Sequence, residues 1–457
     1  KMNLGQSYFD RGLYSEAIVY FIDALNAQTN NIDLHFINNF FPMDTIHYNN
    51  LSNAFEYQVS LDTTGASYFY LSLFSFDKNK AFEYIKLYNN SQPHDIRGLI
   101  HYGKLLYIDN FWYDALFQYS RASWLDKKNF DAQFGIGMCM LKIKKYNFAI
   151  SALKKALIID PYNHIAYYNL GISYMNLKKY EKAIYNLTQA LLLDPENSNT
   201  YSNLGQAYYN NGKLIQAREA FNRAINIDPN YGHAHYYLGL INEDIMEIDK
   251  AISSYSLARE YSPKIEDSFY RLGMLLYRTG NLKEAMEPLR EFIIFQPDSI
   301  NVLYAIGEIF ISESRYQEAI DTYNRIKEFN PENLDVNLYL AKSYSKLLQF
   351  DKAINVYSDI LLFDDENTNV MFEMGDIYNY MYEYKKAENI IIKAINCSFP
   401  TMPMYYQLAM TYGNQKKYMS AILALQKALN LAPKDKEIKY QLGVAYMELN
   451  NYSKASN

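Results

Sequence analysis

Apolar residues recur along this chain in two helical stripes separated by a short polar turn. Residues 164–197 read HIAYYNLGISYMNLKKYEKAIYNLTQALLLDPEN and show the pattern clearly. The first stripe is Tyr167, Leu170 and Tyr174, and the second is Tyr180, Ala183, Leu187 and Ala190. Each spacing places its residues on one side of a helix. The pattern therefore predicts a helix, a turn at Lys178-Lys179 and a second helix.

The pattern repeats every 34 residues from residue 62 to the end of the sequence, without insertion or deletion. Position 1 of this frame falls at residues 62, 96, 130, 164, 198, 232, 266, 300, 334, 368, 402 and 436. Position 20 is then Ala in all twelve units, position 8 is Gly in nine of twelve, and position 32 is Pro in eight of eleven. Small residues at positions 8 and 20 allow two helices to approach closely, and the Pro stops the second helix. Each helix hairpin must stack on its neighbours to bury its apolar faces, which predicts a solenoid.

The signature L-G-x-x-Y, A-x-x-x-F-x-x-A and a closing P at this period resembles the tetratricopeptide repeat. The resemblance implies an all-α, right-handed superhelical solenoid of helix-turn-helix repeats, in which the first helices line a concave groove. We expect eleven repeats in strict register over residues 62–435 and a truncated repeat at 436–457. Residues 1–31 are read as a partial N-terminal repeat, and residues 32–61 as a degenerate repeat or connection.

Composition and charge favour a globular protein over a disordered, membrane or nucleic-acid-binding one. Of 457 residues, 49% are hydrophobic and 21% are charged, and no run of 18 apolar residues could cross a membrane. The net charge of −6 is opposite to the basic footprint of nucleic-acid-binding proteins. The first residues, KMNLGQSYFDRGLYSEA, lack the hydrophobic region of a signal peptide. We expect a cytoplasmic location, with an exported form whose signal has been removed as the alternative.

No catalytic, cofactor or metal site is predicted, because no Gly-rich phosphate loop, HExxH motif or paired-cysteine spacing is present. His233 and His235 are two residues apart, so a helix would point them in different directions. Asp364 to Asn367 (DDEN) replaces the repeat connector DPEN and lacks the pattern of a calcium loop. Cys139 and Cys397 lie seven repeats apart, too far in a solenoid for a disulfide.

The absence of such chemistry predicts a non-enzymatic scaffold or adaptor that binds other proteins, as peptide or helical segments, as part of a larger multiprotein assembly. Positions 2, 5, 9 and 12 lie opposite the packing stripe of the first helix, and the resemblance implies that this side faces the groove. The predicted groove residues are Phe134, Met138, Tyr168, Ile172, Met175, Tyr236, Tyr270, Met274, Tyr277, Tyr304, Phe372 and Tyr406. Apolar residues at positions 9 and 12 make the repeats at 130 and 164 the most continuous apolar wall. The alternative is that these side chains only pack against adjacent helices.

A second functional hypothesis is the substrate-selecting arm of a larger enzyme. The arms of O-linked N-acetylglucosamine transferases carry Asn at position 6 of successive repeats, and Asn169 and Asn203 match that slot here. The following repeats carry Tyr237 and Arg271 instead, so the resemblance to this subclass covers two repeats. Chaperone-tail binding is not expected, because position 5 is never basic and position 9 is never Asn.

The end of the sequence predicts one further contact. Residue 457 falls at position 22 of its repeat, midway through an expected second helix. Solenoids need polar caps over their terminal apolar faces, and Leu442, Tyr446 and Leu449 would form such a face. We therefore expect further chain, a partner subunit or self-association at the uncapped ends.

Overall fold

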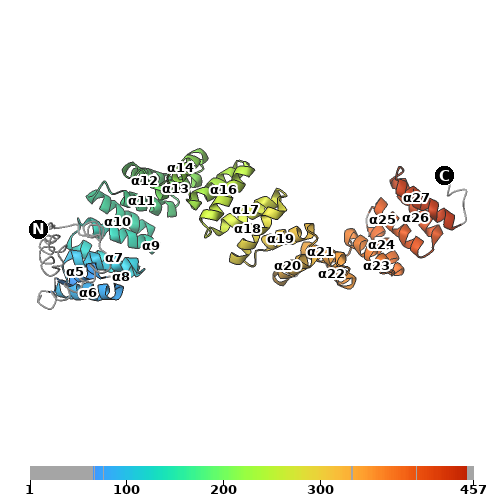
Figure 1. Cartoon of the computed structure of the whole chain (residues 1–457), viewed down its shortest axis with the longest axis horizontal. Helices are drawn as coiled ribbons and strands as arrows, with labels where there is room; N and C mark the ends of the chain where they lie inside the picture. The colour runs from blue at the N-terminus through green and yellow to red at the C-terminus, as the bar shows by residue number, and fades with distance from the viewer. Residues whose placement is uncertain (1–64, 66, 76, 331–332, 398, 450–457) are drawn as a thin grey trace, which may run out of the picture. The chain divides into compact units, whose positions relative to one another are not determined.

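The computed structural model describes residues 65, 67–75, 77–330, 333–397 and 399–449. All regular structure within these ranges is α-helical, which confirms the predicted fold class. The chain divides into two units, residues 1–246 and 247–457, and each is a stack of successive helix pairs (Figure 1). The N-terminal segments 1–31 and 32–61, for which a partial and a degenerate repeat were expected, lie outside the described residues.

The helices follow one another in pairs along both units. The first unit contains α5 (Ser67–Phe74), α6 (Lys78–Ser91), α7 (Ile96–Ile108), α8 (Trp112–Leu125), α9 (Phe130–Lys142), α10 (Tyr146–Ile159), α11 (His164–Asn176), α12 (Tyr180–Leu193), α13 (Ser198–Asn210), α14 (Leu214–Ile227) and α15 (Gly232–Asp244). The second unit contains α16 (Ile248–Tyr261), α17 (Glu266–Arg278), α18 (Leu282–Phe295), α19 (Ile300–Ser312), α20 (Tyr316–Phe329), α21 (Leu334–Lys346), α22 (Phe350–Phe363), α23 (Thr368–Tyr380), α24 (Tyr384–Cys397), α25 (Met402–Asn414), α26 (Tyr418–Leu431) and α27 (Lys436–Glu448). From α7 onwards each odd-numbered helix begins at frame position 1 and each even-numbered helix at position 17.

Asparagine side chains start many of the first helices. Asn129, Asn163 and Asn197 each precede a first helix, and each side-chain oxygen accepts a hydrogen bond from the backbone N–H three residues later, at 2.9, 3.0 and 2.9 Å. Such caps satisfy a backbone donor that has no partner within the helix. The second helices α10 and α12 begin without a side-chain cap, directly after the turn.

The turn between the two helices places position 15 in the left-handed region. Lys178 has φ of 56° and Leu348 has φ of 58°, and Gly212 occupies the same slot with φ of 75°. The Lys178 N–H donates to the Met175 carbonyl at 2.8 Å, and the Lys179 N–H donates to the Tyr174 carbonyl at 2.9 Å. This pair of bonds closes the end of the first helix in a Schellman motif. The polar turn expected from the sequence is therefore a helix cap that also accepts apolar residues.

Glycine at position 8 allows the two helices of a repeat to pack closely. A Cβ atom added to Gly171 would lie 2.7 Å from Leu187 Cγ, and one added to Gly307 would lie 2.6 Å from Tyr323 Cζ. Leu187 and Tyr323 both occupy position 24 and are fully buried. The small residue at position 8 thus makes room for a large side chain at position 24, while the Ala at position 20 is enclosed beside it, as at Ala183.

Candidate functional site

The first helices form the inner side of each stack. In the first unit α7 contacts α9, α9 contacts α11, α11 contacts α13 and α13 contacts α15; in the second unit α17 contacts α19 and α23 contacts α25. Consecutive second helices make no comparably extensive contact among the described residues. Helices that touch their counterparts in the next repeat lie on the more closely spaced side of a curved stack. We call positions 2, 5, 9 and 12 of the first helices the inner face.

The twelve predicted groove residues are all partly buried, so each leaves part of its side chain open to solvent. In the first unit, Phe134, Tyr168 and Met175 pack against one apolar cluster that contains Leu170 and Leu187. The ring of Phe134 also stacks on Phe130 with centroids 5.5 Å apart. The Tyr168 hydroxyl accepts a hydrogen bond of 3.1 Å from the Asn203 amide, and burial raises its pKa.

Met138, Ile172 and Tyr236 complete the predicted set in this unit. Met138 lies on α9 and Ile172 on α11, both at position 9, and Tyr236 lies on α15 at position 5. The Tyr236 ring meets Tyr237 edge to face with centroids 5.3 Å apart.

The inner face of the second unit is more polar. Tyr277 donates a hydrogen bond to Glu308, and Tyr304 meets Tyr339 edge to face with centroids 5.5 Å apart. Tyr270 packs at 5.2 Å from the ring of Phe292, a residue of the second helix α18. These tyrosines therefore serve packing and polar contacts between helices as well as forming the surface.

The remaining predicted residues of the second unit are Met274, Phe372 and Tyr406. Met274 lies on α17 at position 9. The Phe372 carbonyl accepts a hydrogen bond of 2.9 Å from Gln407, and the Tyr406 hydroxyl donates to Glu437 at 3.4 Å.

Polar contacts between successive first helices were not foreseen from the sequence. Gln206 donates to the Tyr237 hydroxyl in the first unit, and Gln407 donates to the Asp376 carboxylate at 2.6 Å in the second. Partial burial raises the pKa of Asp376, although the Gln407 hydrogen bond opposes the shift. Each contact joins position 9 of one repeat to position 6 of the next, and that pairing is the signal that could have revealed them.

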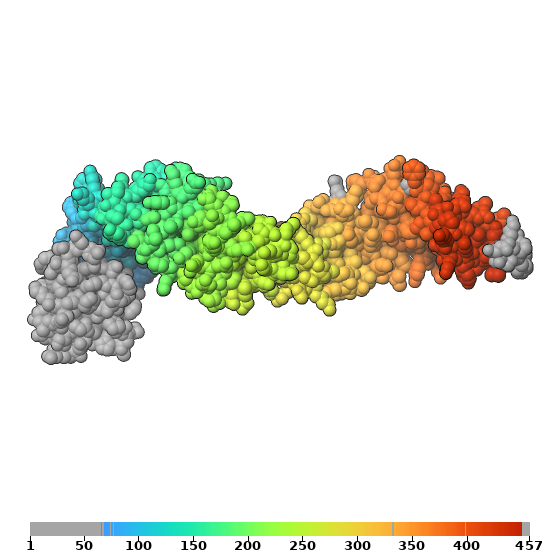
Figure 2. Space-filling model, turned by 90° about the horizontal axis from the view of Figure 1, so that it is seen from above, coloured from blue at the N-terminus to red at the C-terminus, as the bar shows by residue number. Residues whose placement is uncertain are grey.

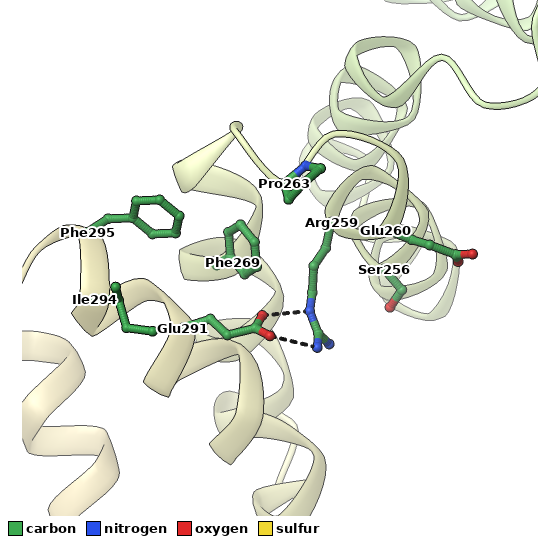
Figure 3. Close-up of a pocket in the computed structure, with 8 residues that line it drawn as sticks. All are labelled: Ser256, Arg259, Glu260, Pro263, Phe269, Glu291, Ile294 and Phe295. Carbon is green, nitrogen blue, oxygen red and sulfur yellow. Dashed lines mark hydrogen bonds and ion pairs between the residues drawn. The ribbon is translucent and has the colours of Figure 1, made fainter.

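A cavity on the outer side of the second unit was also not foreseen. It is an open recess of about 630 Å³ between α16, α17 and α18, and Pro263, Phe269 and Phe295 line its apolar part (Figure 3). Arg259 points across it, with Nε 2.8 Å from Glu291 and Nη2 2.8 Å from Glu287. Partial burial would lower the pKa of Arg259, but the two carboxylates raise it overall. The ion pair, Ser256 and Glu260 form the polar side of the recess.

The structure gives no sign of a metal centre in the described ranges, where no group of three His, Cys, Asp or Glu side chains is arranged to hold an ion. His233 is exposed, whereas His235 is buried with Nε2 2.9 Å from the Pro229 carbonyl. Asp364 accepts a 2.9 Å hydrogen bond from the Asn367 amide at a helix start. Cys139 and Cys397 are free thiols, and burial raises the pKa of Cys139 to about 12.

The helices that the structure describes are also too short or too polar to cross a membrane.

Comparison with known proteins identifies the repeat. Family models described as tetratricopeptide repeat match residues 164–197, 198–231, 270–333 and 403–435. No curated protein matches the chain.

Among solved structures that resemble the chain, three are described. YrrB, titled a TPR protein with an unusual peptide-binding site, is 24% identical, covers 41% of this chain and 96% of its own, and has a TM-score of 0.34.

The other two neighbours come from named bacteria. MamA from residue 41 onwards, from Desulfovibrio magneticus RS-1, is 24% identical over 37% of this chain and 98% of its own, with a TM-score of 0.36. Pseudomonas aeruginosa pilF is 21% identical over 48% of this chain and 97% of its own, with a TM-score of 0.42. The repeat assignment rests on the matching family models together with the helix pairs described above. The chain is a tetratricopeptide repeat protein.

Proposed function

We propose that this chain is a non-enzymatic protein-interaction scaffold that holds an extended or helical segment of a partner along its inner face. The observation that carries the proposal is the series of partly buried aromatic and methionine side chains on successive first helices. Large side chains at the core position 24, such as Tyr255 and Tyr323, are in contrast enclosed completely. The inner-face residues instead keep a free surface while their packed edges hold them in place.

The repeats around α9 and α11 are the favoured contact region. Phe134 and Tyr168 are anchored in the core, so binding orders them at little cost in side-chain entropy. Met138, Ile172 and Met175 add flexible or branched apolar surface beside them, which suits an irregular partner. We propose that a segment bound here continues along Tyr236 within the same unit.

The alternative of an enzyme arm is less well supported by the two asparagines that suggested it. Asn169 is buried and donates to the Ile165 carbonyl of its own helix at 2.8 Å. Asn203 donates to the Asn199 carbonyl at 2.8 Å and to the Tyr168 hydroxyl. Amides engaged in this way do not form a free ladder for a substrate backbone.

Peptides selected by the wild-type chain from a random display library provide the test. We expect apolar peptides whose affinity falls by about 2–4 kcal/mol for the double variant Phe134→Ala with Tyr168→Ala. Because the contact is apolar, the affinity should change little with moderate salt. Circular dichroism would establish that the variant keeps its helical content.

Two control variants separate loss of binding from loss of packing. Tyr168→Phe keeps the ring and removes only the hydroxyl that accepts from Asn203, so it should bind almost normally. Phe148→Ala with Tyr185→Ala removes two exposed rings from the second helices α10 and α12 and should leave affinity unchanged. Equal binding by the Phe134→Ala, Tyr168→Ala variant and the wild type would refute the inner-face assignment.

A further inference from the structure

The outer side of the second helices α8, α10 and α12 carries a row of exposed apolar residues. Position 29 holds Trp124, Ile158 and Leu192, which are 76%, 80% and 70% exposed. Position 29 lies on the side of the helix opposite the buried positions 20, 24 and 27. The repeats that carry these residues are packed against one another without gaps (Figure 2). One exposed apolar residue is ordinary, but the same slot filled in three consecutive repeats makes a surface that water covers poorly.

This surface is basic. Helices α8, α10 and α12 contain four basic residues (Arg121, Lys154, Lys155 and Lys182) and two acidic ones (Asp114 and Glu181), in a chain whose net charge is −6. Lys155, at position 26 of α10, is exposed between the apolar residues, and the guanidinium of Arg121 lies 5.9 Å from the ring of Phe117. We call Phe117, Trp124, Lys155, Ile158, Tyr185 and Leu192 the basic outer face.

The corresponding surface of the second unit has the opposite charge. Helices α18, α20 and α22 contain five basic and eight acidic residues. Their position 29 holds Ile294 and Leu362, which are 78% and 82% exposed, on either side of Glu328. We call Glu287, Ile294, Asp321, Glu328, Asp359 and Leu362 the acidic outer face.

We propose that the basic outer face binds the acidic outer face of a second copy of this chain. Both faces consist of second helices set at the same repeat spacing, so rows of apolar residues and charges on one can meet rows on the other. Opposite charges steer such surfaces together and fix their register, while the apolar side chains lose contact with water.

The outer cavity of the second unit gives this contact an anchor point. The cavity borders the acidic outer face at Ile294 and is lined by the rings of Phe269 and Phe295 (Figure 3). Its volume of about 630 Å³ accommodates a large side chain such as Trp124 of the second copy. Aromatic anchors enclosed in apolar recesses dominate the affinity of many protein interfaces.

The contact joins two different faces, so it is heterologous. In a pair, one copy keeps its acidic outer face unused and the other copy keeps its basic outer face unused. Heterologous contacts of this kind extend into open assemblies or close into rings, rather than ending at a symmetric dimer. The proposal therefore predicts oligomers whose mean size grows with concentration.

Two variants of the full chain, each altering one face, test this. Variant A is Trp124→Ala with Lys155→Glu, and variant B is Ile294→Ala with Asp321→Lys; all four side chains are exposed. By sedimentation velocity at low ionic strength, we expect the wild type to form oligomers and to associate more weakly at about 1 M salt, where the Debye length of about 3 Å screens the charges. Each variant alone should associate at least about 30-fold more weakly than the wild type. An equal mixture of A and B should form a one-to-one dimer and nothing larger, because only one pair of intact faces remains.

A matched control removes the same kinds of group elsewhere. Met419→Ala with Lys427→Glu, both exposed on the second helix α26, should assemble as the wild type does. A wild type that stays monomeric at low salt overturns the proposal, including the case in which it binds anionic lipid vesicles as a monomer. Undiminished self-association of A or B, or a mixture that fails to pair, overturns it equally.

Discussion

The spans α8–α12 and α18–α22 share one architecture and differ mainly at the positions that packing leaves free. In both, a glycine at position 8 lies against a buried side chain at position 24, Gly171 on Leu187 and Gly307 on Tyr323. At position 9, in contrast, the first span carries Met138 and Ile172, whereas the second carries Glu308 and Lys342. The outer faces differ in the sign of their charge.

The comparison separates two kinds of sequence information. Positions 8, 20, 24 and 27 determine how the helices pack: in both spans positions 8 and 20 stay small, whereas positions 24 and 27 vary in size but stay apolar or aromatic, because packing errors are costly. Positions on the inner and outer faces contribute less to packing and can differ without changing the helix pairs. Regions of equal fold therefore present different surfaces. If the packing is uniform, equivalent substitutions at packing positions should have equal effects in the two spans.

The largest expected effect is loss of stability on filling the position-8 slot in either span. Gly171→Ala and Gly307→Ala should each destabilise the surrounding repeats by about 1–3 kcal/mol, since the added carbon overlaps an enclosed side chain. Gly413→Ala is the control, because a Cβ there meets nothing within 4 Å and should be neutral or stabilising by up to about 1 kcal/mol. Hydrogen exchange of the flanking helices measures all three. A normal exchange rate in Gly171→Ala beside an accelerated one in Gly307→Ala would break the comparison.

A smaller effect, different in the two units, is expected on acidification. Burial, helped by the positive charge of Lys104, lowers the pKa of His101 in α7 to about 4. The unfolded chain therefore binds the proton more tightly, so stability is complete above about pH 6.5 and falls as the pH drops toward 4. At pH 5 the local cost to α7 should be roughly 2 kcal/mol.

The raised pKa of Asp376 in α23 works in the opposite direction, because the folded form binds the proton more tightly and gains stability as the pH falls. Hydrogen exchange at pH 7 and pH 5, corrected for intrinsic rates, should show faster opening of α7 and no such loss in α23. His101→Asn can still pair with Ser72 and should remove the acid sensitivity of α7. Equal acid sensitivity of α7 in this variant and the wild type would contradict the assignment.

The fold could be predicted from the sequence because its signals are local and repeated. The 34-residue frame indicated both helices of a repeat, and the observed helices begin at its positions 1 and 17. The left-handed backbone conformation at position 15 could not be predicted from residue type, since Leu348 and Tyr382 adopt it there as Gly212 does. Backbone hydrogen bonds of the helix end, rather than residue type, set that conformation.

The candidate site was less accessible from the sequence. The periodicity predicts which side of a helix faces the groove. It does not predict how much of the Tyr168 or Tyr304 side chain remains exposed once the next repeat packs against it. The Tyr277–Glu308 hydrogen bond and the Arg259 ion pairs depend on the rotation between repeats and on side-chain conformers. The sequence shows apolar residues at position 29 in Trp124, Ile158 and Leu192. Only the structure shows that these side chains are exposed and therefore form a surface.

The most direct test of the central claim exchanges the inner face of one span for that of the other. Met138→Glu with Ile172→Lys gives the first span the side chains found at Glu308 and Lys342, at the same frame position. Titration calorimetry with a peptide selected by the wild type should show at least about a 10-fold loss of affinity, equivalent to about 1.4 kcal/mol, with helical content unchanged. Unchanged affinity in a fully folded variant would contradict the claim that the inner-face residues of the first helices determine which partner binds.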